Sequence, residues 1–436
     1  MSGPGRRIAR ALAMLPLVAA TPLAAQDGAA EDARERLKRQ GLVWALSYTA
    51  EGLGNPRGGV CRGGLYAGKL EGSVSIDFEK MAGWKGLSFF GNAVQIHNTS
   101  GMRDDHFRSL ITLSNIEARR STRLSEIWLE QKFADDKASL RFGRLAADAE
   151  FFIAEQSKLF ISSDWPTILG ANLPNGGPAF PSSANGVRLK IQPTDDAALL
   201  VALFNGDPGD PTRENRFGTN FRFNGPPLLM AEAQYRYDPA APAGLGLLRV
   251  GGWRHFGAFD DQRFDAAGLS LANPLSSGLP RRLRGTSGVY GIVDHQAFRF
   301  AGGEPEHGVN LFARVSATPS DRNLVNVYAD GGVVVSGLLQ SRPSDKFGVS
   351  VLYARISDAA RALDRDGVAF SGAPAPVRSY EMVVEATYLA QMTPAWTLQP
   401  VLQYVVNPAG GAPDPARPRQ AVKGGAVIGL RSVVTY

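Results

Sequence analysis

The amino-acid sequence predicts an all-β fold, a transmembrane antiparallel β-barrel of about 16 strands with short periplasmic turns and long extracellular loops. Three observations lead to this prediction. The chain starts with a secretory leader, it ends in an alternating strand whose last residue is the aromatic Tyr436, and many short segments of alternating polarity lie between the two ends. Because alternate residues of a barrel strand face lipid, such a chain is not strongly hydrophobic on average.

Residues 1–25 have the regions expected of a signal peptide. Three arginines come first, an apolar stretch follows at 8–20, and small residues lead to a cleavage site after Ala25. Leu23 fits the position three residues before that cut poorly, so cleavage after Ala20 stays an alternative. Either cut implies export through the periplasm.

The mature chain divides into two parts. Residues 26–40 are rich in alanine and alternate acidic with basic side chains, which predicts a short helical segment on the periplasmic side. The alternative is a simple N-terminal tail. Residues 41–436 make up the predicted outer-membrane barrel domain.

Composition supports this class and excludes others. The mean hydropathy is -0.13, and no run beyond the leader approaches the ~18–20 apolar residues of a spanning helix. The 49 glycines and 28 prolines suit many short strands joined by turns. The formal charge of +6 falls to +3 without the three leader arginines, which is too little for a nucleic-acid partner. Cys61 is the only cysteine and excludes an internal disulfide.

From residue 41 onward, segments of roughly ten residues alternate in polarity, the length that a tilted strand needs to cross a bilayer. Their even number agrees with a bacterial single-chain barrel. The predicted strands are 42–50, 66–78, 87–97, 122–133, 138–146, 183–191, 197–204, 228–237, 246–256, 285–299, 308–317, 327–338, 347–356, 379–389, 396–404 and 420–435.

The lengths of the connections support the same count, because short and long ones alternate as periplasmic turns and extracellular loops do. Segment 110–118 resembles a further strand, but counting it would place two short turns in succession, so we assign it to a loop. The long connections are 51–65, 98–121, 147–182, 205–227, 257–284, 357–378 and 405–419, with a shorter one at 318–326.

The period of two also predicts which side chains face lipid. Val74 and Ile76 would point outward, as would Leu140 and Phe142, while Arg141 between them points into the lumen. Trp128 shares a face with two glutamates, and we assign that face to the lumen.

Several stretches of the chain are similar, in order, to one known family. The chain resembles the carbohydrate-selective porins, the glucose-porin family of outer-membrane channels. The stretches are 75–83 (SIDFEKMAG), 123–131 (RLSEIWLEQ), 140–152 (LRFGRLAADAEFF), 173–181 (LPNGGPAFP), 186–188 (GVR), 204–208 (FNGDP), 318–323 (TPSDRN), 399–404 (QPVLQY) and 429–431 (GLR).

The resemblance implies a barrel, often trimeric, that passes neutral mono- and small oligosaccharides down their gradient in the outer membrane. It implies that the second and third long loops, 98–121 and 147–182, fold into the lumen. Implied partners are small sugars, outer-membrane lipids and lipopolysaccharide, a homotrimer, and the barrel-assembly machinery through Tyr436, where the family usually has Phe. No cofactor and no nucleic acid are implied.

Sugar recognition needs groups that donate and accept hydrogen bonds, together with flat aromatic faces. Arginines and glutamates gather between residues 117 and 144, and a tryptophan follows in the next loop. The alternative is that these charges pair across strands and hold the wall and the inward loops. The predicted constriction residues are Arg119, Arg123, Arg141, Glu117, Glu126 and Trp165.

Enzymatic signatures are weak. Asp148 and Glu150 are close in sequence, as in glycosidase pairs, but we interpret them as a loop edge. The five histidines show no metal-ligand spacing, and no Gly-x-Ser-x-Gly elbow is present. We therefore predict a passive channel without metal or turnover. The alternatives are a general or anion-preferring porin, an outer-membrane barrel hydrolase, and a structural or adhesive barrel.

Overall fold

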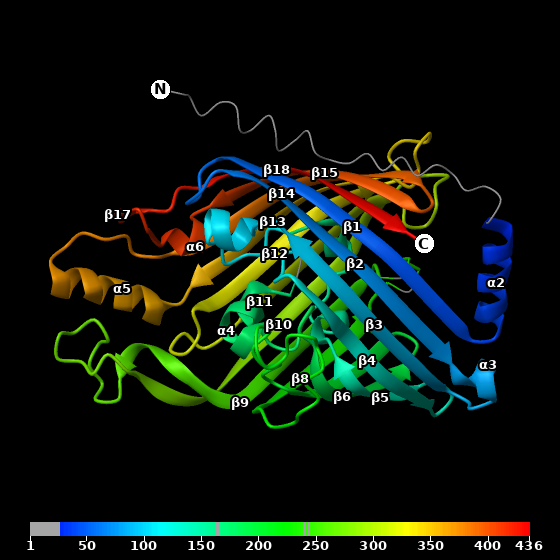
Figure 1. Ribbon diagram of the computed structural model, residues 1–436, viewed down its shortest axis with the longest axis horizontal. Coiled ribbons are helices and arrows are strands. Elements are labelled where there is room, and N and C mark those ends of the chain that lie inside the picture. The colour runs from blue at the N-terminus through cyan, green and yellow to red at the C-terminus, as the bar shows by residue number, and fades with distance from the viewer. Residues whose placement is uncertain (1–26, 163–164, 239, 243) are drawn as a thin grey trace.

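A computed structural model describes residues 27–162, 165–238, 240–242 and 244–436. Sixteen of its strands form one closed antiparallel barrel, in which each strand pairs with the barrel strands before and after it and β18 closes the ring against β1 and β15 (Figure 1). The predicted fold class is therefore confirmed. The predicted signal peptide lies outside the described residues.

The barrel strands follow one another around the ring in chain order. They are β1 (Leu42–Arg57), β2 (Gly63–Asp77), β3 (Leu87–Asn98), β4 (Ser121–Phe133), β5 (Ala138–Leu145), β6 (Ala184–Thr194), β7 (Ala197–Asn205), β8 (Pro227–Arg236), β9 (Leu247–Asp265), β10 (Pro280–Arg299), β11 (Gly308–Ala317), β12 (Val325–Ser336), β13 (Lys346–Ile356), β14 (Tyr380–Thr393), β15 (Trp396–Val406) and β18 (Gly425–Thr435).

Helical segments are short and lie in the connections between strands or before β1. They are α2 (Asp27–Arg39), α3 (Phe78–Ala82), α4 (Thr167–Asn172), α5 (Asp358–Ser371), α6 (Pro408–Gly411), the π-helix η2 (Met102–Phe107) and the 3₁₀ turns η3 (Ala147–Ala149), η4 (Gln156–Leu159) and η5 (Pro174–Gly176). In the described part of the chain, no helix is both long and apolar enough to cross a membrane.

Some strand ends differ from the predicted ones. β1 and β2 continue to within five residues of each other, so the long loop expected at 51–65 is a tight connection at 58–62. β9 and β10 extend in the same way. The polarity of a strand alternates only where one of its faces meets lipid, whereas the antiparallel hydrogen bonds between these strands continue past that segment. Residues 417–421 pair with β16 (Pro413–Asp414) as β17 (Arg417–Ala421), so the closing strand begins only at Gly425.

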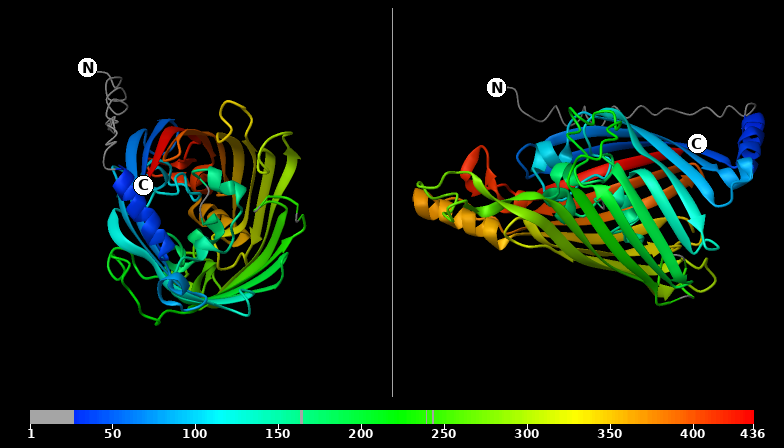
Figure 2. Two further views of the ribbon diagram at one scale, coloured as in Figure 1. Left: turned by 90° about the vertical axis from the view of Figure 1, so that its right-hand side faces the viewer. Right: turned by 90° about the horizontal axis from the view of Figure 1, so that it is seen from below.

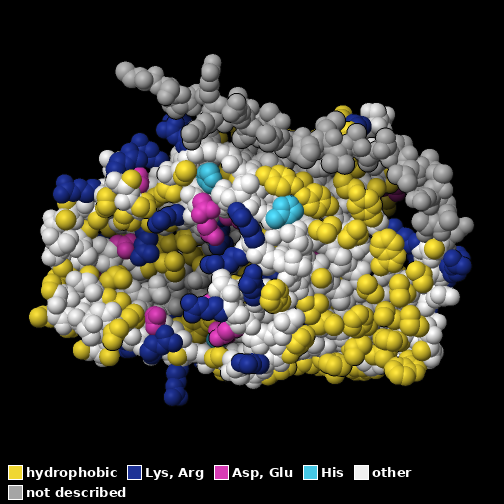
Figure 3. Space-filling view, viewed as in Figure 1, with side chains coloured by type: hydrophobic (Ala, Val, Ile, Leu, Met, Phe, Trp, Pro, Cys, Tyr) yellow, Lys and Arg dark blue, Asp and Glu magenta, His cyan; other side chains and the backbone are white. Residues whose placement is uncertain are grey.

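The facing predicted from the period of two agrees with the exposure of the side chains. Val74, Leu140 and Phe142 are exposed on the outer surface, while Arg141 is paired with a glutamate of the neighbouring strand. Many other large apolar side chains of the strands are exposed as well, and they form the broad apolar area on the right of Figure 3. This area is the surface that meets lipid.

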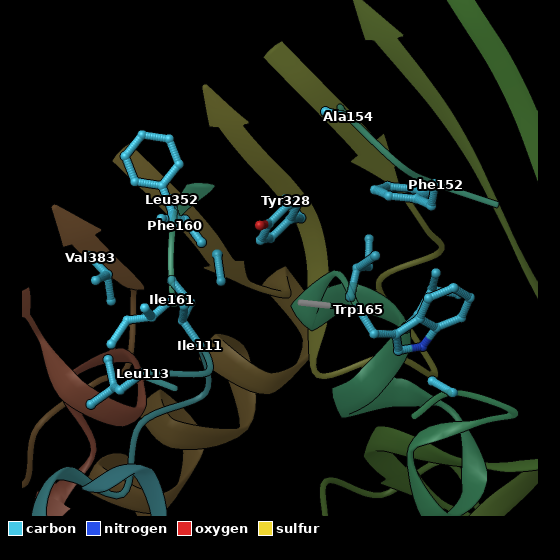
Figure 4. Packing of buried hydrophobic residues seen from close by; sticks show 14 of the residues in the cluster. Ile111, Leu113, Phe152, Ala154, Phe160, Ile161, Trp165, Tyr328, Leu352 and Val383 are labelled. Atoms are coloured by element: carbon cyan, nitrogen blue, oxygen red, sulfur yellow. The ribbon is translucent and has the colours of Figure 1, made fainter. Parts of the chain in front are cut away.

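Two long connections occupy the interior of the ring. We call the β3–β4 connection, residues 99–120, loop L2, and the β5–β6 connection, residues 146–183, loop L3. Figure 2 (left) looks along the barrel and shows their helical turns inside the ring of strands. Segment 110–118 lies in L2 and is not a strand. A buried apolar cluster joins side chains of both loops to the inner face of the barrel, and Figure 4 shows the part of it at β12, β13 and β14.

Candidate functional site

A network of four charged side chains lies on the inner wall formed by β4, β5 and β6. The strand register places Arg141 of β5 opposite both Glu130 of β4 and Arg188 of β6. Arg141 Nη2 is 2.8 Å from Glu130 Oε2, and Arg188 Nη2 is 2.9 Å from Glu130 Oε1. L3 supplies the fourth member, Glu150, 3.3 Å from Arg141 and 2.8 Å from Arg188. Two arginines and two glutamates therefore balance each other.

The two arginines differ in how far solvent reaches them. The side chain of Arg188 is 2% exposed and also donates to Ser139 Oγ at 2.7 Å. The side chain of Arg141 is 15% exposed. Arg188 therefore holds the network together from inside the wall, and Arg141 presents the network to the lumen.

An aromatic face adjoins Arg141. Its guanidinium lies 3.7 Å from the ring centroid of Trp128, and the Trp128 ring stacks on Phe90 with centroids 5.1 Å apart. The indole Nε1 of Trp128 is buried and has no hydrogen-bond partner among the described residues. Both rings line an open cavity of about 380 Å³ that also includes Ser75 and Ser88. Stacked aromatic rings beside a guanidinium and hydroxyl groups suit the two faces of a sugar ring.

A second polar strip continues from this network along β2 and β3. Lys69 Nζ is 2.7 Å from Glu71 Oε2, and Asn92 donates to Glu71 at 2.9 Å. Lys69 also lies 4.9 Å from the ring centroid of Phe180 in L3. Glu126 connects this strip to L3, because its Oε1 accepts from the Ala146 amide at 3.1 Å.

Other parts of the inner wall, on β8, β10 and β14, hold the loops by a different chemistry. Buried carboxylates of the strands accept hydrogen bonds from main-chain amides of L2 and L3, which satisfies both partners. The pairs are Glu381 with the Leu110 and Ile111 amides (2.9 and 2.7 Å), Glu385 with Ile161 and Ser162 (both 2.9 Å), Glu232 with Phe152 (3.0 Å) and Asp294 with Glu155 and Gln156 (both 3.1 Å).

Of the predicted constriction residues, the structure places Arg141 and Glu126 on the polar wall. Glu117 lies elsewhere in L2, where it accepts from the Arg103 and Asp104 amides at the start of η2. Burial raises the pKa of its carboxyl to about 7, although those amide hydrogen bonds oppose the shift. The structure thus gives Glu117 a role in folding the loop.

The other predicted residues lie away from the network. Trp165 is buried in the apolar part of L3 near α4, as Figure 4 shows, and Arg119 is exposed at the end of L2. Arg123 is buried and donates to the carbonyl of Asn215 at 3.0 Å. Sequence reasoning missed Arg188 as a member of the network, although the period of two that found Arg141 marks it as inward too. It assigned Glu150 to a loop edge.

A closed antiparallel barrel with inward loops and a polar inner wall is the architecture of a bacterial outer-membrane porin. The family model described as carbohydrate-selective porin, OprB family, matches residues 62–436, so the chain belongs to that family. It is accordingly a passive carbohydrate porin and not an enzyme. In the described residues, no group of three or more His, Cys, Asp or Glu side chains is arranged to hold a metal ion.

Individual relatives agree with this membership. The chain is 25% identical to Porin B of Pseudomonas aeruginosa over 394 residues, 86% of this chain and 85% of that one. It is 22% identical to the putative porin QuiX of Acinetobacter baylyi over 411 residues, 86% of this chain and 87% of that one. The high-pH structure of Pseudomonas putida OprB superposes with a TM-score of 0.81 at 21% identity, covering 94% of this chain and 97% of that one, and shows the shared fold.

Proposed function

We propose that mono- and small oligosaccharides cross this barrel between L3 and the β2–β6 wall, and that Arg141, Glu130, Glu150 and Trp128 contact them. The observation that carries this proposal is the position of Arg141, which is ion-paired, stacked on Trp128 and still partly exposed. A sugar hydroxyl both donates and accepts hydrogen bonds, so paired guanidinium and carboxylate groups can serve it without a net charge.

The balance of charge favours a neutral solute over an anion. Arg141 and Arg188 are matched by Glu130 and Glu150, and Lys69 is matched by Glu71. An anion filter needs an excess of positive charge at the narrow point, and that filter would be screened by salt. An anion-preferring porin is therefore the second candidate function, after a porin for neutral sugars.

The test is liposome swelling with the purified, refolded protein in glucose, maltose, larger oligosaccharides and amino acids of matching size. We expect sugars to enter faster than amino acids of equal size. Rates that follow size alone would indicate a general porin. Zero-current potentials in salt gradients, at low and high ionic strength, form the second arm, and a strong anion preference that salt weakens would support the alternative.

We also propose that the exported chain assembles in the outer membrane through its last residue and functions as a homotrimer, with residues 26–40 on the periplasmic side. The support is that the Tyr436 amide donates to Leu46 O at 2.8 Å while its ring is exposed and free for recognition. Deletion of Tyr436 should reduce the amount of heat-modifiable barrel in cells. Normal amounts after the deletion would contradict the role in assembly, and cross-linking of subunits in membranes tests the trimer.

A further inference from the structure

The open cavity beside the Trp128 ring combines apolar side chains with few hydroxyl groups. Its volume is about 380 Å³, and five of its eleven lining residues carry apolar side chains. These five are Val43, Ile76, Phe89, Phe90 and Trp128. Such a lining offers an apolar ring more contact than it offers hydrogen bonds to the many hydroxyls of a sugar.

The charged residues of this cavity are matched within the protein. Asp77 Oδ1 accepts from the Glu79 and Lys80 amides at 3.0 and 3.3 Å. Lys80 Nζ is 3.6 Å from Asp77 Oδ2, and Lys38 Nζ is 3.4 Å from Glu35 Oε1. The cavity therefore presents no excess of either charge, and its apolar side chains decide what it can bind.

The position of the cavity places it next to the charge network and inside the barrel. Its residues come from the end of α2, from β1 to β4 and from α3, and Figure 1 shows α2 and α3 together at one end of the barrel. L2 and L3 leave the strands at the other end. Phe90 lies directly opposite Trp128 in the register of β3 and β4, so both rings point into the lumen.

A stack of three planar groups joins the network to the cavity. The strand order β3–β4–β5 places Phe90 and Arg141 on opposite sides of Trp128. The guanidinium lies 3.7 Å from the centroid of the indole, and the Phe90 ring lies 5.1 Å from it. The thickness of one indole ring therefore separates the guanidinium from Phe90, and a sugar together with a ring attached to it can reach both.

We propose that this cavity binds the aromatic aglycone of a glycoside whose sugar ring contacts the Arg141 network. The inference rests on the proposed function, because it uses the same sugar contacts, and it extends the solute class from free sugars to uncharged aryl glycosides. The sugar hydroxyls bond to Arg141, Glu130 and Glu150, and the aryl ring packs against Phe90 and Val43.

The size and the chemistry of the cavity agree with a single aryl ring. An apolar cavity of about 150 Å³ is enough to hold benzene in a protein interior, so the present cavity has room for one such ring. Transfer of the ring from water to apolar side chains favours binding, and an aromatic pair adds to that. Together with the sugar contacts, one stacked ring should strengthen binding about two- to tenfold.

The test compares phenyl β-D-glucoside with methyl β-D-glucoside as blockers of the ion current through the full-length refolded protein in planar bilayers. The two solutes share the sugar and differ in the aglycone. We expect the phenyl glucoside to block at a concentration about two- to tenfold lower. Phe90→Ser should bring the ratio of the two half-blocking concentrations close to one, and Phe90→Tyr, which keeps the ring, should restore it.

The matched control is Phe133→Ser at the end of β4. Phe133 is exposed and is not among the residues that line the cavity, so this variant should keep the wild-type ratio. Ser75→Leu narrows the cavity from β2 without altering the stack and should also lower the ratio, which tests the cavity apart from Phe90. Heat-modifiability of each variant shows that its barrel is folded.

The outcomes separate this inference from the proposed function. Equal half-blocking concentrations of the two glucosides in the wild type would overturn the aglycone site and leave the sugar path standing. A higher affinity for the phenyl glucoside that survives both Phe90→Ser and Ser75→Leu would also overturn it. Block by the phenyl glucoside with none by the methyl glucoside would contradict the sugar path, and the aglycone site would fail with it.

Discussion

The two sides of the lumen use the same residue types for different purposes. On the wall near β14, Glu381 and Glu385 are fully buried and give their oxygens to main-chain amides of L2 and L3. On the wall of β4–β6, Glu130 and Glu150 give their oxygens to arginines, one of which reaches solvent. A buried lumenal carboxylate that accepts from loop amides is therefore an anchor, and we propose that one whose arginine partner reaches solvent contacts the solute.

The comparison has an energetic side. A main-chain amide that loses a buried acceptor stays buried and unpaired, which costs about 1–3 kcal/mol. An arginine that loses one of two carboxylates keeps the other. Loss of an anchoring carboxylate should therefore change the width of the channel. Loss of a residue of the β4–β6 network should change only the selectivity of the channel between solutes.

The largest effect is expected for Glu385→Ala. The substitution leaves the Ile161 and Ser162 amides without their acceptor, and at about 1–3 kcal/mol for each unpaired group it should release this part of L3 from the wall. We expect higher single-channel conductance and entry of longer oligosaccharides in the swelling assay.

Glu385→Gln is the matched control, because it keeps one acceptor oxygen in the same place. It should lie between the alanine variant and the wild type. An alanine variant with unchanged conductance and unchanged size limit would show that the apolar cluster alone holds L3.

The second effect is expected for Arg141→Ala. The barrel should still fold, because Arg188 remains paired with both glutamates. Loss of one guanidinium contact should change sugar entry about two- to tenfold relative to amino acids of equal size, as one hydrogen-bonding group is worth about 0.5–1.5 kcal/mol.

Arg417→Ala is the control for this experiment. Arg417 is paired with Asp414 in the small β16–β17 sheet and does not contact the wall network. If Arg141→Ala blocked barrel assembly while flux per folded pore stayed the same, Arg141 would belong to the anchors and the comparison would fail.

The sequence predicted the barrel well because every strand carries its own evidence. The period of two was enough to turn Arg141 inward and Phe142 outward, and the alternation of short and long connections was enough to keep segment 110–118 out of the strands. Strand ends were less well predicted, because backbone hydrogen bonds between strands can continue beyond the residues whose polarity alternates.

The loops could not be predicted in this way. Glu117 was grouped with the arginines that follow it, but its carboxyl meets amides 13 and 14 residues earlier in the chain. Trp165 was chosen for its aromatic face, but that face is buried in the apolar cluster. Glu150 reaches the network only because L3 folds back onto the β4–β6 wall, and no local sequence pattern predicts that path.

The third effect concerns the order of L2 at different pH. The folded pKa of Glu117 is about 7, raised from its ordinary value by burial, so the folded loop favours the protonated acid. The stabilisation is fully present below the ordinary pKa near 4.5 and is lost as the pH rises through 7. We expect amides of residues 101–117 to exchange hydrogen faster at pH 8 than at pH 5 after correction for the intrinsic rate. Glu117→Gln should remove this pH dependence, and a variant that kept it would assign the effect to another group.

The smallest effect is expected for Trp128→Phe, and it separates the two contributions of the aromatic face. Phenylalanine keeps a ring under the Arg141 guanidinium and next to Phe90, but it lacks the indole N–H that has no partner in the described structure. If sugars are recognised by stacking, selectivity for sugars over amino acids should change less than about twofold, and Trp128→Ala should lower it several-fold. Equal losses in the phenylalanine and alanine variants would instead assign the contribution to the indole N–H, which is buried in this structure and would have to become accessible to a sugar. A Trp128→Ala barrel with wild-type selectivity would remove Trp128 from the solute path and leave the charge network alone as its polar lining.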